Sequence, residues 1–313
     1  MQFTTPVPVA PSQNPITYKS RLLLLGSCFA ENMADKFRYF GFRQTANPFG
    51  IIYQAQALET IVRRSLYGDD FSDSIIEWNE GFHSFDAHSD MSRFSADETL
   101  SALRSASTEL NNAIADASHI IITLGTAWQY RLQSTGKTVA NCHKLPSSHF
   151  VKELATIESI ESNLHAMADL IHKVNPNARL ILTVSPVRHI KDGFVENQLS
   201  KSHLIAAMHG FIGQSNSAEY FPSYEIVMDE LRDYRFYACD MLHPSQTAID
   251  YIWEKFAASG IDESSRVIMA KVEKARRAMN HRPFNPESAR HKEFEAQLKA
   301  QLFELERDYG IVL

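Results

Sequence analysis

The sequence predicts an α/β fold in which helices cover both faces of a parallel sheet, followed by a C-terminal helical extension. Three short apolar runs, at residues 22–25, 119–124 and 179–184, carry this prediction. They show no alternation of apolar and polar residues, which is typical of strands buried on both faces. Segments with helical periodicity separate them, and such alternation indicates right-handed crossovers between parallel strands.

The remaining elements follow from periodicity and from turn residues. The residues after the first strand show a helical rhythm up to Phe40, and Gly41 supplies a stop signal. Between residues 157 and 174 the apolar positions recur in steps of three and four, which predicts an amphipathic helix. We also expect a turn at 45–50, helices at 55–67, 98–114 and 201–212, an irregular insertion with short strands at 71–94, a strand at 224–228, and a helix opened by Pro244.

The chain divides into a main domain at residues 1–260 and a helical extension at 261–313. Beyond Gly260 the composition becomes strongly charged, and helices are expected at 264–279 and 285–309. The last helix carries a narrow apolar stripe, formed by Phe294, Leu298, Leu302 and Leu305. This stripe either docks on its own domain or forms a contact in a homodimer.

Composition restricts the class of protein. The net charge of −6 shows no basic bias, so we expect no nucleic-acid partner. Residues 1–20 lack the basic and apolar regions of a signal peptide, and no apolar run approaches the ~20 residues of a membrane span. Three widely spaced cysteines fit a reducing compartment. These features predict a soluble, cytoplasmic protein without a membrane partner.

The end of the first strand is the expected centre of the chemistry. The strand breaks at Gly26, and Ser27 then stands at the start of a helix, outside the carboxyl end of a buried strand. Asp240 and His243, three residues apart in a later loop, are able to act as an orienting carboxylate and a general base. We expect Ser27 to be the nucleophile.

Two neighbouring features bear on this assignment. Cys28 is a rival nucleophile at the same helix terminus, but adjacent side chains diverge, and we expect Cys28 to pack as a small hydrophobe in the core. A developing oxyanion needs hydrogen-bond donors. The backbone N–H of Ser27 and that of Gly50, which closes a turn after Asn47, are the expected donors, although Gly50 also fits an ordinary turn.

Several ordered blocks of the chain resemble the GSCFA family, over about residues 20–258. The first block is Gly26-Ser27-Cys28-Phe29-Ala30, which gives the family its name. The others are Asn47-Pro48-Phe49-Gly50-Ile51, Thr123-Leu124-Gly125-Thr126-Ala127-Trp128, Val139-Ala140-Asn141-Cys142-His143-Lys144, Ser185-Pro186-Val187-Arg188-His189 and Asp240-Met241-Leu242-His243-Pro244-Ser245. That family is similar to SGNH (GDSL-type) hydrolases. The resemblance implies a three-layer, flavodoxin-like fold with Ser27 as nucleophile, His243 as base, Asp240 as its orienter and Gly50 as the glycine of the second block.

The chain departs from the SGNH pattern in two places. The acidic residue that precedes the serine in that superfamily is replaced by Gly26, and the block at residues 125–128 lacks the asparagine that donates to the oxyanion. Substitute donors are Thr126 beside Gly125, Asn47 and Asn141. The loop residues His143, Arg188 and His189 are candidates for substrate recognition, or they anchor their loops.

The predicted function is a serine acyl-ester hydrolase that acts on a small O-acylated carbohydrate or metabolite. An acyltransferase with the same triad, or a catalytically silent binding protein, remains an alternative. The histidines and cysteines show neither H-x-x-x-H nor C-x-x-C spacing, so we expect neither a metal site nor a cofactor.

Overall fold

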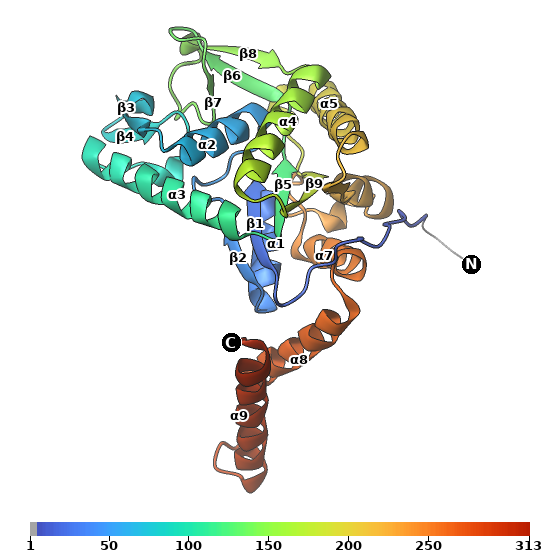
Figure 1. Cartoon of the computed structure of the whole chain (residues 1–313). Coiled ribbons are helices and arrows are strands. Elements are labelled where there is room, and N and C mark those ends of the chain that lie inside the picture. Colours follow the sequence, from blue (N-terminus) through green and yellow to red (C-terminus); the bar gives the residue numbers. More distant parts are fainter. Residues whose placement is uncertain (1–4) are drawn as a thin grey trace.

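The predicted α/β architecture is confirmed by the computed structural model, which describes residues 5–313. Five parallel strands form the central sheet in the order β10-β9-β5-β1-β2 (Figure 1). Counted along the chain within this sheet, the order is 2-1-3-4-5, which is the flavodoxin-like order. The strands are β1 (Arg21–Gly26), β2 (Arg43–Ala46), β5 (His119–Leu124), β9 (Arg179–Val184) and β10 (Ala218–Tyr220).

The consecutive leucines of β1 supply both faces of the sheet. Leu23 and Leu25 face a core packed by α2 to α5, whereas Leu22 and Leu24 face a second core packed by α1, α7 and α8. Successive strand side chains point to opposite faces, so a strand between two helical layers needs apolar residues at every position. The uninterrupted apolar run therefore results from the three-layer arrangement.

The helices lie close to their expected positions. Ser27, Ser95, Thr156 and Ser245 cap four of them by accepting a backbone N–H with the side-chain oxygen. The helices are α1 (Cys28–Tyr39), α2 (Ala55–Tyr67), α3 (Ala96–Asp116), α4 (Ile157–Val174), α5 (Phe194–Gly213), α6 (Ser223–Glu225), α7 (Gln246–Gly260), α8 (Glu263–Met279) and α9 (Ala289–Tyr309).

Two small antiparallel sheets lie outside the central one. The expected irregular insertion contains a hairpin of β3 (Ile75–Trp78) and β4 (Gly81–Ser84). The second small sheet was not predicted, and it consists of β6 (Trp128–Leu132), β7 (Thr138–Val139) and β8 (Phe150–Leu154). Its strands are mixed in polarity and mostly half-buried, so they lack the apolar runs by which the main strands are recognised.

Three expectations were wrong in detail. Residues 224–228 form helical turns rather than a strand, because the fifth strand is completed earlier, by Ala218–Tyr220 on β9. The helix expected to open at Pro244 begins at Gln246 with Ser245 as its cap, so Pro244 precedes the cap. The helix expected at 201–212 starts seven residues earlier, at Phe194.

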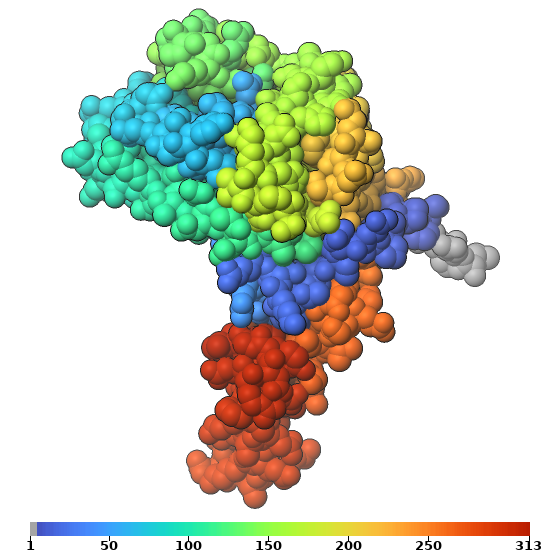
Figure 2. Space-filling view, in the orientation of Figure 1, coloured from blue at the N-terminus to red at the C-terminus, as the bar shows by residue number. Residues whose placement is uncertain are grey.

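The C-terminal extension leaves the main body as a helical hairpin of α8 and α9, in orange to red (Figures 1 and 2). The chain end returns to the body, where Ile311 packs against Gly41 and Arg276 Nε donates to the Tyr39 carbonyl at 2.5 Å. Leu305, from the apolar stripe of α9, is buried in the second core, which α1, α7 and α8 also pack. The homodimer expected through these helices stays a prediction. No helix in residues 5–313 combines the length and the hydropathy needed to cross a bilayer.

Candidate active site

Several candidate residues lie in the segments that follow β1, β5 and β9. Gly26 of β1 pairs with Thr123, and Leu124 of β5 pairs with Val184, so the segments that follow these strands begin at the same edge of the sheet. From β1 the chain passes to β2 at one edge of the sheet, and from β5 it later passes to β9, towards the other edge. Ligands of open parallel sheets bind at such a switch point.

Gly26 fixes the turn between β1 and α1. Its φ is +130°, and a Cβ at this position would lie 2.1 Å from the Thr123 carbonyl oxygen. Its N–H donates to Asn47 Oδ1 at 2.8 Å, and its carbonyl accepts the N–H of Ile52 at 3.0 Å. Only glycine fits this backbone, which then starts a helix immediately beyond the strand.

Ser27 is occupied by structural hydrogen bonds. The residue is 2% exposed, and its Oγ accepts the Phe29 N–H at 3.3 Å as the cap of α1. Its own N–H donates to the Thr123 carbonyl at 3.0 Å and extends the ladder between β1 and β5. The Ser27 N–H, which the sequence suggested as an oxyanion donor, is therefore already used.

Cys28 is the first residue of α1, and it is partly exposed rather than packed in the core as expected. The pKa of its thiol is raised above the ordinary value, by burial first and then by the nearby Glu31 carboxylate, although the Lys201 charge and the backbone N–H groups of Cys28 and Phe29 act to lower it. These N–H groups belong to the first turn of the helix, where the helix itself provides no acceptors. The first turn therefore offsets part of the cost that burial imposes on a thiolate at Cys28.

Asp240 and His243 form the expected pair in the loop before α7. Asp240 Oδ2 accepts the Nδ1–H of His243 at 2.5 Å, while Oδ1 accepts the backbone N–H groups of Leu242 and His243 at 2.9 and 3.0 Å. The N–H groups of His243 and Leu242, followed by the His243 ring, hold the pKa of Asp240 well below its usual range. With Nδ1 held by the carboxylate, Nε2 is left to exchange a proton, and 48% of the His243 side chain is exposed.

The donors expected in the second block are used internally. The Gly50 N–H donates to the Asn47 carbonyl at 2.7 Å, within the turn. Asn47 is buried, with Oδ1 on Gly26 and Nδ2 3.4 Å from Glu31 Oε1. This block holds the β1–α1 turn in place.

Thr126 and Asn141 also make local hydrogen bonds. Thr126 Oγ1 bonds Ser200 Oγ at 2.9 Å and accepts the Trp128 N–H at 3.1 Å, and Asn141 Oδ1 accepts the His143 N–H at 2.8 Å. These contacts anchor the loops after β5 and β7.

His143 lies in the loop after β7 and packs against the insertion at residues 71–94. Its Nε2 lies 2.6 Å from the Ser84 carbonyl, and its ring stacks on His83 with centroids 4.9 Å apart. Burial is the main cause that lowers the pKa of His143 to about 4. His143 therefore links the β3–β4 hairpin to the main body.

Arg188 braces the loop that carries the Asp240–His243 pair. Its guanidinium donates to the Met241 carbonyl and lies over the Tyr237 ring, 4.6 Å from the centroid. Because it contacts this loop both before the pair and within it, Arg188 anchors the loop, which agrees with the loop-anchoring interpretation.

His189 presents an unused donor or acceptor at the end of β5. Its Nε2 is buried and has no hydrogen-bond partner within residues 5–313. This atom lies 3.2 Å from the point that a Cβ on Gly125 would occupy, and the ring packs against Tyr53. Burial, followed by the charges of Lys201 and His243, lowers the pKa of His189 to about 3, so the imidazole is neutral at physiological pH.

Lys201 was not recognised from the sequence as a site residue. It is fully buried, and its Nζ donates to the carbonyls of Gly125 at 2.7 Å and Ser185 at 2.6 Å, just beyond β5 and β9. The available signal was its position on the buried face of α5, between Asn197 and Leu204. A lysine on an inward helical face is rarely fully buried without a specific partner.

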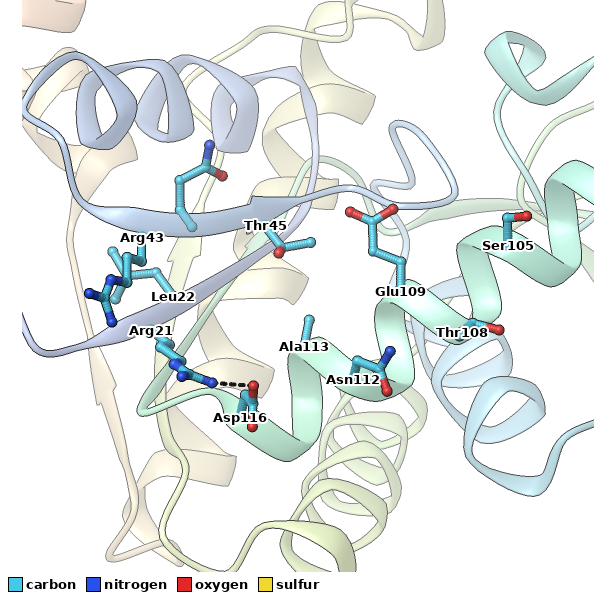
Figure 3. Close-up of a pocket in the computed structure, with 11 residues that line it drawn as sticks. Arg21, Leu22, Arg43, Thr45, Ser105, Thr108, Glu109, Asn112, Ala113 and Asp116 are labelled. Atoms are coloured by element: carbon cyan, nitrogen blue, oxygen red, sulfur yellow. Dashed lines mark hydrogen bonds and ion pairs between the residues drawn. The ribbon is translucent and has the colours of Figure 1, made fainter. Parts of the chain in front are cut away.

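A hollow of about 700 Å³ lies away from the candidate residues, at the edge of the sheet where the parallel strands begin. It lies between the starts of β1 and β2 and helix α3 (Figure 3). Arg21 and Asp116 form an ion pair at its margin. None of the candidate catalytic residues lines it. In the part of the chain that the structure describes, no three His, Cys, Asp or Glu side chains gather in a way that would hold a metal ion.

Comparison with protein families gives two matches along the chain. The model described as the GSCFA family matches residues 21–256, which include Cys28, Asp240 and His243. The model described as the GSCFA domain protein, C-terminal domain, matches residues 272–311, which span the C-terminal part of α8 and all of α9. No curated protein matches the chain.

Proposed function

The chain belongs to the GSCFA family, and from this membership and the geometry of the sheet edge we propose that it hydrolyses acyl esters through a covalent acyl-enzyme. The hydrogen bond between Asp240 and His243 carries the proposal. A carboxylate that fixes Nδ1 of a partly exposed imidazole prepares Nε2 to act as a general base.

The nucleophile in this proposal is delivered by the first turn of α1. Ser27 is the residue that the sequence favours, but its Oγ caps the helix and its N–H belongs to the sheet ladder. Cys28 is more exposed, and the first-turn N–H groups lie at its thiol. We therefore favour the thiol of Cys28 over the hydroxyl of Ser27.

The reaction proceeds in two halves. His243 takes the thiol proton while Cys28 Sγ bonds to the ester carbonyl carbon, and the carbonyl oxygen becomes an oxyanion. When the oxyanion collapses, the C–O bond to the alcohol breaks and His243 returns the proton to the leaving oxygen, which leaves a thioester. Water then attacks the thioester with His243 as base, and the acid and the free thiol are released.

Two donors are suited to the oxyanion. The first is the backbone N–H of Cys28, in the first turn of α1. The second is Nε2–H of neutral His189, which has no partner within residues 5–313 and lies beside Gly125. His189 then takes the place of the asparagine that the third block lacks.

The proposed substrate is a small O-acylated carbohydrate or metabolite. The exposure of His243 supports water as the acceptor of the acyl group. Transfer to another alcohol would use the same residues, and product analysis with added alcohols distinguishes the two reactions.

The test combines chromogenic acyl esters with peptide mapping of two probes, a fluorophosphonate and iodoacetamide. We expect Cys28→Ala and His243→Ala to abolish turnover. Ser27→Ala should retain turnover and lose about 1 kcal/mol of stability with its helix cap. If instead the probes label Ser27 and Ser27→Ala loses activity, the nucleophile is Ser27. If a folded sample shows neither turnover nor labelling at either residue, the enzyme proposal is wrong.

A further inference from the structure

The buried amine of Lys201 is the feature that the proposed mechanism has not used. Its two hydrogen bonds go to the carbonyls of Gly125 and Ser185. Within residues 5–313, no carboxylate lies within ion-pair distance of its Nζ, which is 5.6 Å from the centroid of the Tyr224 ring. Two carbonyl oxygens and a π face are the surroundings of a cation, yet no anion balances its charge.

The strand pairing places the segments that hold Lys201 and Cys28 at the same edge of the sheet. Gly26 pairs with Thr123, so Cys28 and Gly125 each lie two residues beyond the same rung of the ladder. Lys201, on α5, donates to the Gly125 carbonyl and so lies at the same edge of the sheet as the N-terminus of α1. The influence is reciprocal, because the charge of Lys201 lowers the pKa of Cys28 and Cys28 raises that of Lys201.

The charged groups around this amine are few. Cys28 approaches from α1, and the neutral ring of His189 approaches from the loop after β9. Glu31, also in α1, acts on Cys28 and opposes ionisation of its thiol. The pKa of Lys201 is lowered to about 7 by burial, although Cys28 acts to raise it. A buried cation without a counter-charge is costly, and an anion formed beside it is stabilised in return.

We propose that Lys201 supplies the buried counter-charge for the anions that form at the N-terminus of α1. The first anion is the thiolate of Cys28, and the second is the oxyanion of the tetrahedral intermediate. Lys201 acts in its protonated form, and the thiol proton passes to His243. Lys201 is a positioning residue, because it acts through Cys28 and the carbonyls of Gly125 and Ser185. This inference rests on the proposed function.

The experiment measures alkylation of Cys28 by iodoacetamide against pH, with the modified peptide quantified by mass spectrometry. Lys201→Gln is the informative variant, because one amide nitrogen keeps two N–H donors for the two carbonyls while the positive charge is lost. We expect the inflection of the profile to rise by about one pH unit and the rate at pH 7 to fall about tenfold. The exposed Cys239 serves as an internal reference, and the exposed Lys173→Gln as the matched control.

A folded Lys201→Gln protein with the wild-type inflection would overturn the proposal, because a purely structural lysine leaves the thiol pKa unchanged. If the variant fails to fold, the titration of Lys201 is followed by carbon-13 NMR in the wild type and in Cys28→Ser. The proposal requires a lower pKa of Lys201 in Cys28→Ser, and an unchanged value contradicts it. Neither readout needs ester turnover, so failure of this inference is distinguishable from failure of the hydrolase proposal.

Discussion

Asp240 binds His243 twice, through the backbone N–H with Oδ1 at 3.0 Å and through the ring Nδ1 with Oδ2 at 2.5 Å. One carboxylate thus shapes the loop and orients the imidazole within it. The arrangement depends on four consecutive residues and on the positive φ of Met241 between them. The pair is therefore formed locally, while Arg188 connects it to the loop after β9.

Asp240→Asn should lower kcat/KM for ester hydrolysis by about 10²–10⁴-fold without unfolding the protein. The amide oxygen still accepts the backbone N–H groups of the loop, but the amide nitrogen donates to Nδ1 and imposes the wrong tautomer on His243. Steady-state kinetics with a chromogenic ester measure the effect. Asp233→Asn, which removes an exposed carboxylate bonded to Arg235 in a nearby turn, is the control. Equal activity of the two variants would remove Asp240 from the mechanism.

His189→Phe should lower kcat by about 10²–10³-fold with a smaller change in KM, because an oxyanion donor acts mainly in the transition state. The phenyl ring retains the packing against Tyr53 but has no N–H. His189→Gln, which restores a donor, should recover part of the loss. A phenylalanine variant with wild-type kcat would exclude His189 as the donor. Circular dichroism establishes that each variant is folded.

Gly26→Ala should destabilise the protein by about 2–4 kcal/mol, because it combines a φ of +130° with a Cβ 2.1 Å from the Thr123 carbonyl oxygen. Urea unfolding measures the change. Gly136→Ala is the matched control, since Gly136 has a φ of +71° but no atom within 4 Å of its built Cβ. It should cost about 1–2 kcal/mol from the backbone alone. Equal losses would mean that the approach of β5 does not restrict Gly26.

His143 should make the folded state sensitive to acid. Burial lowers its pKa to about 4 in the folded protein, whereas an unfolded histidine titrates near 6.5, so the unfolded chain binds the proton more readily. Its contribution is complete above pH 6.5 and is lost as the pH falls from 6.5 towards 4. The variant His143→Gln keeps a donor for the Ser84 carbonyl. Between pH 7 and pH 4.5 its free energy of unfolding should fall by about 1–3 kcal/mol less than that of the wild type.

Urea unfolding at both pH values measures this difference. The exposed His281→Gln controls for the substitution itself. If the wild type and His143→Gln show the same dependence on pH, the ring of His143 is solvated in the folded state.

The sequence alone determined the elements whose cause is local. Buried strands between two helical layers must be apolar at every position, so β1, β5 and β9 are readable as uninterrupted runs. The spacing of Asp240 and His243 indicated their contact because one loop contains both. The GSCFA sequence blocks were likewise identified from the sequence alone.

Only the tertiary structure decided the elements and contacts that depend on distant partners. The strand Arg43–Ala46 has little apolar character and is defined by its pairing with β1. Residues 224–228 are helical because Ala218–Tyr220 had already completed the sheet. Which of Ser27 and Cys28 lies open beside Lys201 depends on the register of β1 against β5, which a one-dimensional pattern does not contain. Hydrophobic periodicity records which face of an element is buried, whereas the partner across that face is fixed only when the layers pack.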